Sequence, residues 1–276
     1  MLELIKNAFR ISNDNIILGI PLIFFMWVTV VYISYAQYAA TSFPGRLLAI
    51  ITVLLMLGAF MAGWFYMVKK AIKLSKKEFV MDNDRAKAVF NLFKQIPTGI
   101  GKYFLSFVGF SFLILFVFFI LANILYIIGI NTIGYLDIDP NQLKTIGNSA
   151  ISVGAFIETL SESQVVRLFL WEVLFLIGYA IVMFLTSMWV PEIIYQTKNP
   201  LIALFKSIKK VFKKPLEVMC LFFFLGLTNM LIAFLASFAM YNPITYIIIM
   251  MVQFYFFIYA ITLVFTFYEK MYVEEN

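Results

Sequence analysis

Residues Leu204–Phe224 read LFKSIKKVFKKPLEVMCLFFF, and this stretch decides the fold. Its first eleven residues hold five lysines, whereas the residues after Glu217 are predominantly apolar as far as Met240. An α-helix needs about 20 mostly apolar residues to cross a bilayer. The stretch therefore predicts a membrane-spanning helix with dense positive charge at its entrance.

The composition of the whole chain agrees with a membrane protein. Of its 276 residues, 63% are hydrophobic and 13% are charged, whereas soluble domains carry about a quarter of charged residues. We predict a single transmembrane domain over residues 1–276. One cysteine, Cys220, excludes an internal disulfide, and the absence of histidine removes the commonest metal ligand and general base. These absences weigh against a hydrolase or metalloenzyme, so we expect no catalytic residue, no metal site and no cofactor.

Six stretches are long and apolar enough to cross a bilayer: Ile16–Tyr35, Leu47–Val68, Phe104–Ile128, Leu168–Val190, Val218–Met240 and Ile244–Phe267. The apolar part of a cleaved signal peptide is about 7 to 15 residues long. The first stretch exceeds this length, so we expect it to be retained as a span. The predicted fold is all-α and polytopic, with six transmembrane helices arranged as three hairpins.

Basic residues are distributed unequally between the segments that alternate across the membrane. All but three of the 21 lysines and arginines fall on the side that holds both termini and the two long basic loops. Cytoplasmic loops carry the excess of lysine and arginine in membrane proteins. The sequence therefore predicts a multi-pass protein of the cell (inner) membrane with cytoplasmic N- and C-termini.

A basic amphipathic helix is predicted at residues 200–214, between the helix-starting pair Asn199 and Pro200 and the helix-ending Pro215. At 100° per residue one face is apolar, with Leu201, Leu204, Phe205, Ile208, Val211 and Phe212, and the other carries Lys206, Lys209, Lys210 and Lys213. Short helices of this kind lie in the membrane interface. We predict that the four lysines contact lipid headgroups, although the need for positive charge on the cytoplasmic side would by itself explain them.

The same pattern precedes two other pairs of spans. Residues 84–96 and 2–12 also place apolar side chains on one face and charged side chains on the other. In the first of these helices, Pro97 is predicted to be the stop. The chain is thus interpreted as three units, about 1–83, 84–199 and 200–276, each an interfacial helix followed by a hairpin. Their residue identities match poorly, so common ancestry of the units stays open.

Four polar side chains fall inside the predicted spans. Asn229 and Gln253 lie at similar depth in the last two spans and are predicted either to hydrogen-bond to each other or to line a solute path. Glu172, about one turn inside the fourth span, lies at a depth similar to that of Asn123 in the third. We interpret Glu172 as a carboxylate that reaches headgroup water or pairs with Arg167, or else as a coupling residue of a transporter.

Two acidic residues outside the spans form a D-x-D sequence, Asp137 and Asp139. This pattern holds a divalent metal in some glycosyltransferases. An Asp-Pro pair after Tyr-Leu is also common turn chemistry, and the predicted topology places it on the extracytoplasmic side, away from nucleotide sugars. We therefore interpret it as a turn.

The two stretches that lead into the first and fifth predicted spans resemble sequences of a known group of membrane proteins. The stretches IKNAFRISNDNIILGIPLIFF (5–25) and LIALFKSIKKVFKKPLEVM (201–219) resemble entries found in uncharacterised prokaryotic six-helix membrane proteins. Those proteins are similar to the membrane domain of some glycerophosphodiester phosphodiesterases. The resemblance covers about a fifth of the chain, implies an accessory role within the membrane and carries over no catalytic residue.

The predicted function is that of a non-enzymatic membrane protein that binds or organises lipids or assists a partner. The expected partners are membrane lipids, anionic ones in particular, and not nucleic acid. A protein partner or a homo-oligomer is left open. The alternative prediction is a transporter or channel for a small or lipophilic solute, with a path near Asn229, Gln253 and Glu172.

Overall fold

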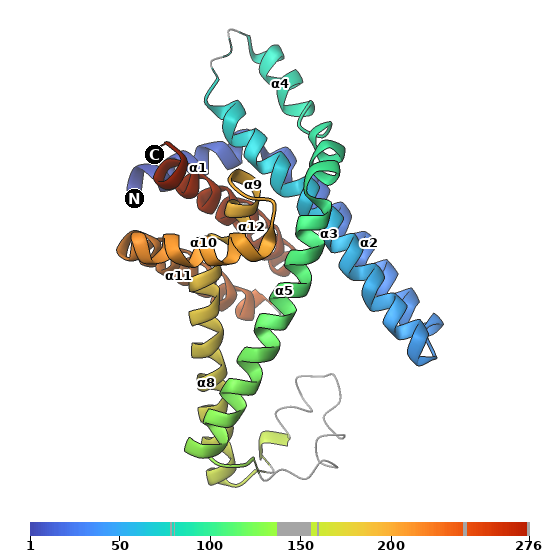
Figure 1. Cartoon of the computed structure of the whole chain (residues 1–276), viewed down its shortest axis with the longest axis vertical. Coiled ribbons are helices and arrows are strands. Elements are labelled where there is room, and N and C mark those ends of the chain that lie inside the picture. The colour runs from blue at the N-terminus through green and yellow to red at the C-terminus, as the bar shows by residue number, and fades with distance from the viewer. Residues whose placement is uncertain (78, 80, 137–155, 159, 240–241, 275–276) are drawn as a thin grey trace. The chain divides into compact units, whose positions relative to one another are not determined.

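The structure, a computed structural model, describes residues 1–77, 79, 81–136, 156–158, 160–239 and 242–274 (Figure 1). All elements within these ranges are helical. They are α1 (Leu2–Asp14), η1 (Ile16–Leu18), α2 (Gly19–Ala39), α3 (Phe43–Ser75), α4 (Asp82–Phe90), α5 (Gln95–Thr132), α8 (Glu162–Thr186), α9 (Trp189–Tyr195), α10 (Pro200–Lys213), α11 (Pro215–Ala239), α12 (Pro243–Glu269) and the π-helix η2 (Lys270–Glu274).

Six helical regions in the described ranges are long and apolar enough to cross a membrane, one for each predicted span. The prediction of an all-helical fold with six helices long and apolar enough to span a membrane is therefore confirmed for the described residues. The described chain divides into two compact units, residues 1–113 with 184–276, and residues 114–183. They are called the first and second unit below.

Capping residues explain where several of these helices begin. Ser42, Asn199 and Asn242 each accept hydrogen bonds from backbone N–H groups of the first turn, and a proline follows within the first two positions of each helix. A side-chain oxygen at this position satisfies donors that have no partner within the helix, and proline there loses no hydrogen bond. These short polar sequences thus fix the turns before α3, α10 and α12.

Two boundaries differ from the prediction. Pro97 does not end the second predicted interfacial helix, because α4 already ends at Phe90 and Pro97 lies in the first turn of α5. Proline is tolerated in a first turn, where its missing N–H would have no helical partner. The predicted fourth span is also divided, since α8 ends at Thr186 and the short helix α9 follows.

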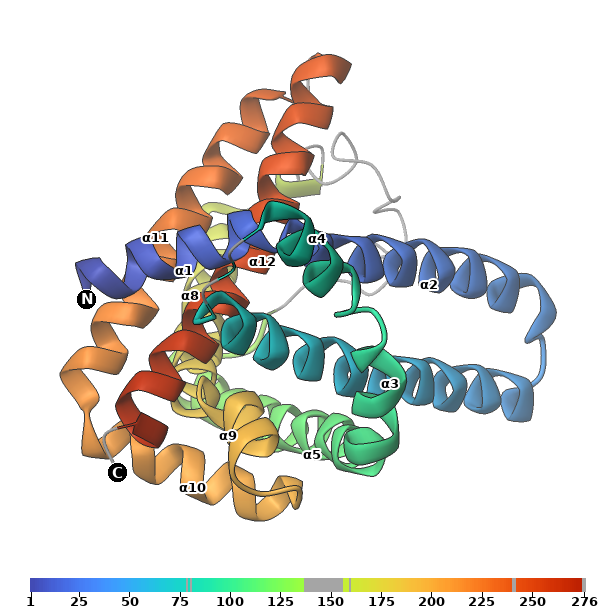
Figure 2. The same cartoon turned by 90° about the horizontal axis from the view of Figure 1, so that it is seen from above.

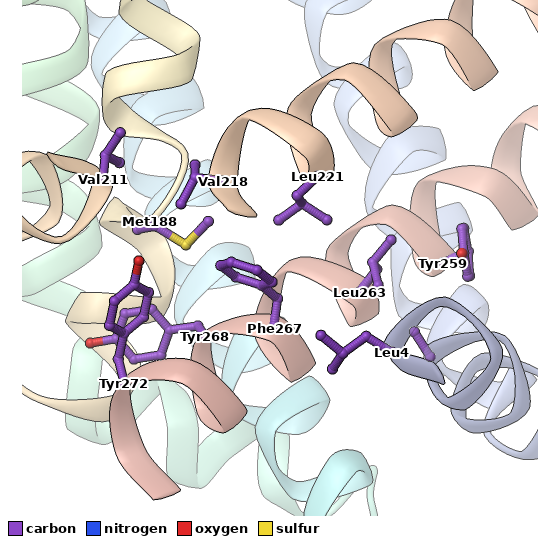
Figure 3. Close-up of a cluster of buried hydrophobic side chains, with 11 residues drawn as sticks. Leu4, Met188, Val211, Val218, Leu221, Tyr259, Leu263, Phe267, Tyr268 and Tyr272 are labelled. Carbon is purple, nitrogen blue, oxygen red and sulfur yellow. The ribbon is translucent and has the colours of Figure 1, made fainter. Parts of the chain in front are cut away.

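The interior of the first unit surrounds the C-terminal half of α12. Side chains from α1, α10, α11, α12 and η2 and from Met188 form one buried apolar cluster: Leu4, Ala8, Met188, Val211, Val218, Leu221, Tyr259, Leu263, Phe267, Tyr268 and Tyr272 (Figure 3). Close packing of side chains against one another is one of the forces that hold helices together within a bilayer. This cluster therefore holds the end of the last span against α1, α10 and α11.

Close packing also joins α2, α3 and the start of α5 in the first unit. Figure 2 shows α2 and α3 side by side up to the turn that connects them. Trp64 of α3 is buried, donates a hydrogen bond from Nε1 to the Leu18 carbonyl (2.8 Å) and stacks with both Phe60 and Phe257. Gly99 of α5 lies so close to α3 that an added Cβ would come within 2.6 Å of the Ala62 carbonyl oxygen. Small residues allow this approach of two backbones.

The second unit contains the second half of α5 and most of α8. The two helices pack against each other, with Leu125 over Gly178 and the Trp171 ring over Gly129. Phe118 stacks on Tyr179 with 5.6 Å between the ring centroids. The pairs 125–178 and 129–171 run in opposite chain directions, so the helices are antiparallel.

Candidate functional site

Glu192 is the most deeply buried charged residue of the described chain, with 0% of its surface exposed. It lies on α9, whose other buried residues fix the helix within the first unit; these are Trp189, Pro191, Ile193 and Ile194. Trp189 donates a hydrogen bond from Nε1 to the Pro200 carbonyl (2.8 Å), which ties α9 to the start of α10. Because the apolar neighbours of Glu192 on α9 are buried, its carboxylate also lies in the interior of the first unit.

Glu192 meets two partners there. Lys210 of α10 forms an ion pair with it, with 2.6 Å between Nζ and Oε2, and the Tyr268 hydroxyl of α12 donates a hydrogen bond to the same oxygen. Lys210 also donates to the Tyr268 hydroxyl. Burial of a charge is costly unless it is paired and hydrogen-bonded. The carboxylate is thus compensated by a cation and a hydroxyl from two other helices.

Aromatic rings surround the Lys210 ammonium group. Its Nζ lies 4.4 Å from the ring centroid of Tyr268 and 5.4 Å from that of Tyr272, distances at which a cation is attracted to a π face. The Tyr272 hydroxyl donates to the Lys210 carbonyl (2.9 Å). Glu192 Oε1, by contrast, has no hydrogen-bond partner within the described residues. This group of side chains, Glu192, Lys210, Tyr268 and Tyr272, is called the buried ion-pair cluster.

A second group of ionic contacts joins the end of α3 to the end of α12. Lys76 pairs with Glu274 and, at 3.4 Å, with Glu269. Partial burial lowers the pKa of Lys76, but its hydrogen bond to Glu274 and the charges of both carboxylates outweigh this effect and raise the pKa above its ordinary value. Lys69, two turns earlier, donates to the Ile194 carbonyl (2.8 Å) and lies 4.4 Å from the Tyr195 ring centroid. Lysines of α3 therefore bind both α9 and the C-terminal end.

These contacts hold helices together, because each of them joins side chains from different helices. Glu192, Glu269 and Glu274 are each paired with a lysine that comes from another part of the first unit. Among the described residues, no three histidine, cysteine, aspartate or glutamate side chains are close enough to hold a metal ion. Asp137 and Asp139 lie outside the described residues.

The predicted headgroup lysines of α10 separate into two kinds. Lys206, Lys209 and Lys213 are exposed, whereas Lys210 belongs to the buried ion-pair cluster. The opposite side of the helix, with Ala203, Ser207 and Val211, is buried within the first unit. At 100° per residue Lys210 lies between these two faces, so helical position alone does not separate it from the other lysines.

A third face of α10 is apolar and exposed. Leu201, Phe205 and Phe212 are 48%, 65% and 68% exposed. The helix therefore presents three faces: one packed on the protein, one apolar and open, and one carrying the three exposed lysines.

The polar residues predicted inside the spans are not brought together in pairs. Asn229 and Gln253 are both exposed, and no hydrogen bond joins them in the described chain. Asn123 is exposed and donates to the Phe119 carbonyl of its own helix (2.7 Å). Glu172 is exposed too, while its suggested partner Arg167 donates to the Tyr135 carbonyl (3.2 Å).

Glu192 is absent from the residues predicted from sequence, because the predicted fourth span ends at Val190. One signal in the sequence points to it, the single acid within the otherwise apolar run Trp189–Tyr195. A lone acid among apolar residues at the end of a span is expected to find a buried partner.

Comparisons with known proteins bring no relative. No protein-family model, curated protein or solved structure matches this chain. The resemblance to membrane domains of glycerophosphodiester phosphodiesterases therefore stays a prediction.

Proposed function

We propose that this chain is a non-enzymatic protein of the cell (inner) membrane that binds anionic lipids at its cytoplasmic surface and serves there in an accessory role. In this proposal both termini are cytoplasmic. The six spans form three hairpins, and α1, α4 and α10 lie in the cytoplasmic membrane interface. The resemblance of the two membrane entries to those of prokaryotic accessory membrane domains agrees with such a role.

The three faces of α10 are the observation that carries the proposal. A helix that packs one face on the protein and leaves Phe205 and Phe212 exposed needs an apolar surrounding for those rings. In the interface the rings reach the acyl chains, while Lys206, Lys209 and Lys213 extend toward phosphate groups. Each cation near an anionic membrane surface contributes about 1 kcal/mol of attraction.

The test is the lipid content of the purified protein. A variant with Lys206→Gln, Lys209→Gln and Lys213→Gln is compared with one that carries arginine at the same positions and so keeps the charge. Mass spectrometry of the extracted lipids should show a lower ratio of anionic to zwitterionic lipid for the glutamine variant alone. An unchanged ratio would contradict lipid binding through α10.

One observation favours transport as a second candidate function. Gln253 lines a cleft of about 340 Å³ between α2 and α12, together with Leu22, Met26, Met250, Phe254 and Phe257. A polar side chain in an otherwise apolar cleft within a predicted span is a candidate part of a solute path. Solute flux in proteoliposomes tests this, because wild-type flux in the double variant Asn229→Leu, Gln253→Leu would remove both residues from any path.

A further inference from the structure

Besides the Gln253 cleft, the first unit holds a polar cavity and an apolar groove that are lined by adjacent stretches of the chain. The first is polar, has a volume of about 250 Å³ and lies between the end of α1, the end of α3 and α4. It is lined by Arg10, Asp14, Asn15, Leu74, Ser75, Lys77, Phe79, Arg85 and Val89. This cavity is called the basic pocket.

The charges of the basic pocket favour an anion. Three of its lining residues are cationic, Arg10, Lys77 and Arg85, and one is a carboxylate, Asp14. Asp14 forms an ion pair with Arg85, with 2.5 Å between Oδ2 and Nη2. Arg10 donates to the side-chain carbonyl of Asn7 (3.0 Å), a neutral group, and no carboxylate pairs with Arg10 or Lys77 in the described chain. Among the described residues, two positive charges of the pocket, those of Arg10 and Lys77, are thus without a negative partner.

Asn15 adds an unused acceptor to the same pocket. The residue is 2% exposed, its Nδ2 donates to the Ile11 carbonyl (2.9 Å), and its Oδ1 is buried without a partner among the described residues. A buried acceptor without a partner costs about 1–3 kcal/mol. A ligand that carries a hydroxyl beside its anionic group would remove this cost.

The second cavity is an apolar groove of about 500 Å³ between α2, α3 and the start of α5. Its lining is entirely apolar: Ile20, Pro21, Phe24, Phe25, Val28, Met56, Ala59, Phe60, Phe93, Ile96 and Ile100. Ala59 has the smallest side chain of this lining, so a larger residue at this position would occupy part of the groove. This cavity is called the apolar groove.

The chain passes from the basic pocket to the apolar groove at two places. Val89 lines the pocket and Phe93, four residues later, lines the groove; likewise Asn15 lines the pocket and Ile20 the groove. Along α3 the distance from Phe60 to Ser75 is 15 residues, or roughly 22 Å at 1.5 Å per residue. One leaflet of a bilayer, headgroups included, is about 20–22 Å thick.

We infer that the basic pocket and the apolar groove form one binding site for an anionic phospholipid with a hydroxyl-bearing headgroup. The phosphate lies against Arg10 and Lys77, a headgroup hydroxyl donates to Asn15 Oδ1, and an acyl chain follows the groove past Ala59. This inference rests on the proposed function, since it needs α1 and α4 at the cytoplasmic interface, but it involves no residue of α10. A soluble phosphate compound or a partner helix would satisfy only one of the two cavities.

The experiment measures binding of phosphatidylglycerol to the delipidated full-length protein in a neutral detergent, with phosphatidylcholine as the uncharged comparison. The double variant Arg10→Gln, Lys77→Gln should bind phosphatidylglycerol up to about thirtyfold more weakly, about fivefold for each cation. Its binding of phosphatidylcholine should not change. Unaltered phosphatidylglycerol affinity in this variant would overturn the assignment of the pocket.

The groove is tested by filling it. Ala59→Phe should weaken phosphatidylglycerol binding, whereas Ala233→Phe on the exposed side of α11 should leave it unchanged. If Ala59→Phe does not fold, Ala59→Leu replaces it. This variant should also weaken phosphatidylglycerol binding, but by less, because leucine is smaller than phenylalanine. If Ala59→Phe binds phosphatidylglycerol as tightly as Ala233→Phe does, no acyl chain occupies the groove and the inference is overturned.

Two further arms separate the alternatives. Soluble glycerol phosphate should not displace phosphatidylglycerol; displacement at equal concentration would assign the pocket to a soluble phosphate compound and overturn the lipid site. The α10 glutamine variant should retain phosphatidylglycerol at the basic pocket. If only the α10 variant loses anionic lipid, the inferred site is wrong and the proposed function stands; if only the pocket variant does, the site stands and the role of α10 is wrong.

Discussion

Removal of Lys210 is expected to be far more harmful than removal of any other lysine of α10. In Lys210→Met the Glu192 carboxylate stays in the interior with 1% of its side chain exposed and without its cation. Loss of one partner of a buried ion pair costs about 3–5 kcal/mol. The Tyr268 hydroxyl still donates to Glu192, and a hydrogen bond to a charged group contributes about 1.5–3 kcal/mol, so the lower end of the range, about 3 kcal/mol, is expected.

Removal of the Glu192 charge should destabilise the protein less than removal of the Lys210 charge. In Glu192→Gln the charge left behind is that of Lys210, whose side chain is 19% exposed and can reach water more easily than Glu192 can. The double variant Glu192→Leu, Lys210→Met removes both charges and should be closer to the wild type than Lys210→Met alone, because replacement of a whole buried pair by apolar groups is often neutral. The predicted order of destabilisation is Lys210→Met, then Glu192→Gln, then the double variant.

The assay is resistance to unfolding in detergent, followed by size-exclusion chromatography after heating and by fluorescence of the buried Trp64 and Trp189. Lys209→Met is the matched control, because Lys209 is exposed one position away and should stay within about 0.5 kcal/mol of the wild type. If Lys210→Met and Lys209→Met unfold at the same temperature, Glu192 is not buried against Lys210 and the description of the cluster is wrong.

Two other predictions concern helix packing and topology. Gly129→Ala should disturb the α5–α8 pair, since its Cβ would lie 2.2 Å from the Trp171 ring, while Gly226→Ala in the open interior of α11 should be neutral or stabilising by up to about 1 kcal/mol; equal melting of the two variants would contradict the α5–α8 contact. In a Cys220→Ser background, a membrane-impermeant thiol reagent applied to intact cells should label Tyr135→Cys and not Lys87→Cys. Labelling of Lys87→Cys in intact cells would reverse the proposed orientation.

The spans were predictable because their signal is local. A run such as Ile244–Phe267 identifies itself by length and hydropathy, whatever the rest of the chain does. The helix starts at Asn199 and Asn242 follow from a side-chain oxygen followed by proline, which is again a property of a few adjacent residues. Such signals do not depend on which helices later meet.

The buried ion-pair cluster could not be predicted in the same way. Glu192 is separated from Lys210 by 18 positions and from Tyr268 by 76, so their contact depends on how α9, α10 and α12 pack. Helical periodicity places Lys210 beside both the lysine face and the packed face, and only the position of Glu192 decides between them. The error at Pro97 has a similar origin, since proline ends one helix or begins the next according to where the preceding chain turns.

The position of this cluster gives the first unit two kinds of environment. Its enclosed part lies at the span ends that the proposed topology places on the cytoplasmic side. There, charged side chains from the ends of α3 and α12 and from α9 and α10 form ion pairs and hydrogen bonds. Farther along α2 and α11, large side chains such as Phe24 and Phe234 are 65% and 60% exposed. Lipid tails are as apolar as these side chains, so no hydrophobic force drives them together within a bilayer.

The stability of the first unit is therefore expected to depend on the enclosed end, and the exposed lengths of α2 and α11 are left to contact lipid. Substitution of Phe24 or Phe234 by leucine should change little, because an apolar side chain still meets acyl chains there. The same change at Phe267, which is fully buried beside Leu263, removes ring contacts that no lipid can replace. Similar heat resistance of Phe267→Leu and Phe234→Leu would contradict this division of the unit.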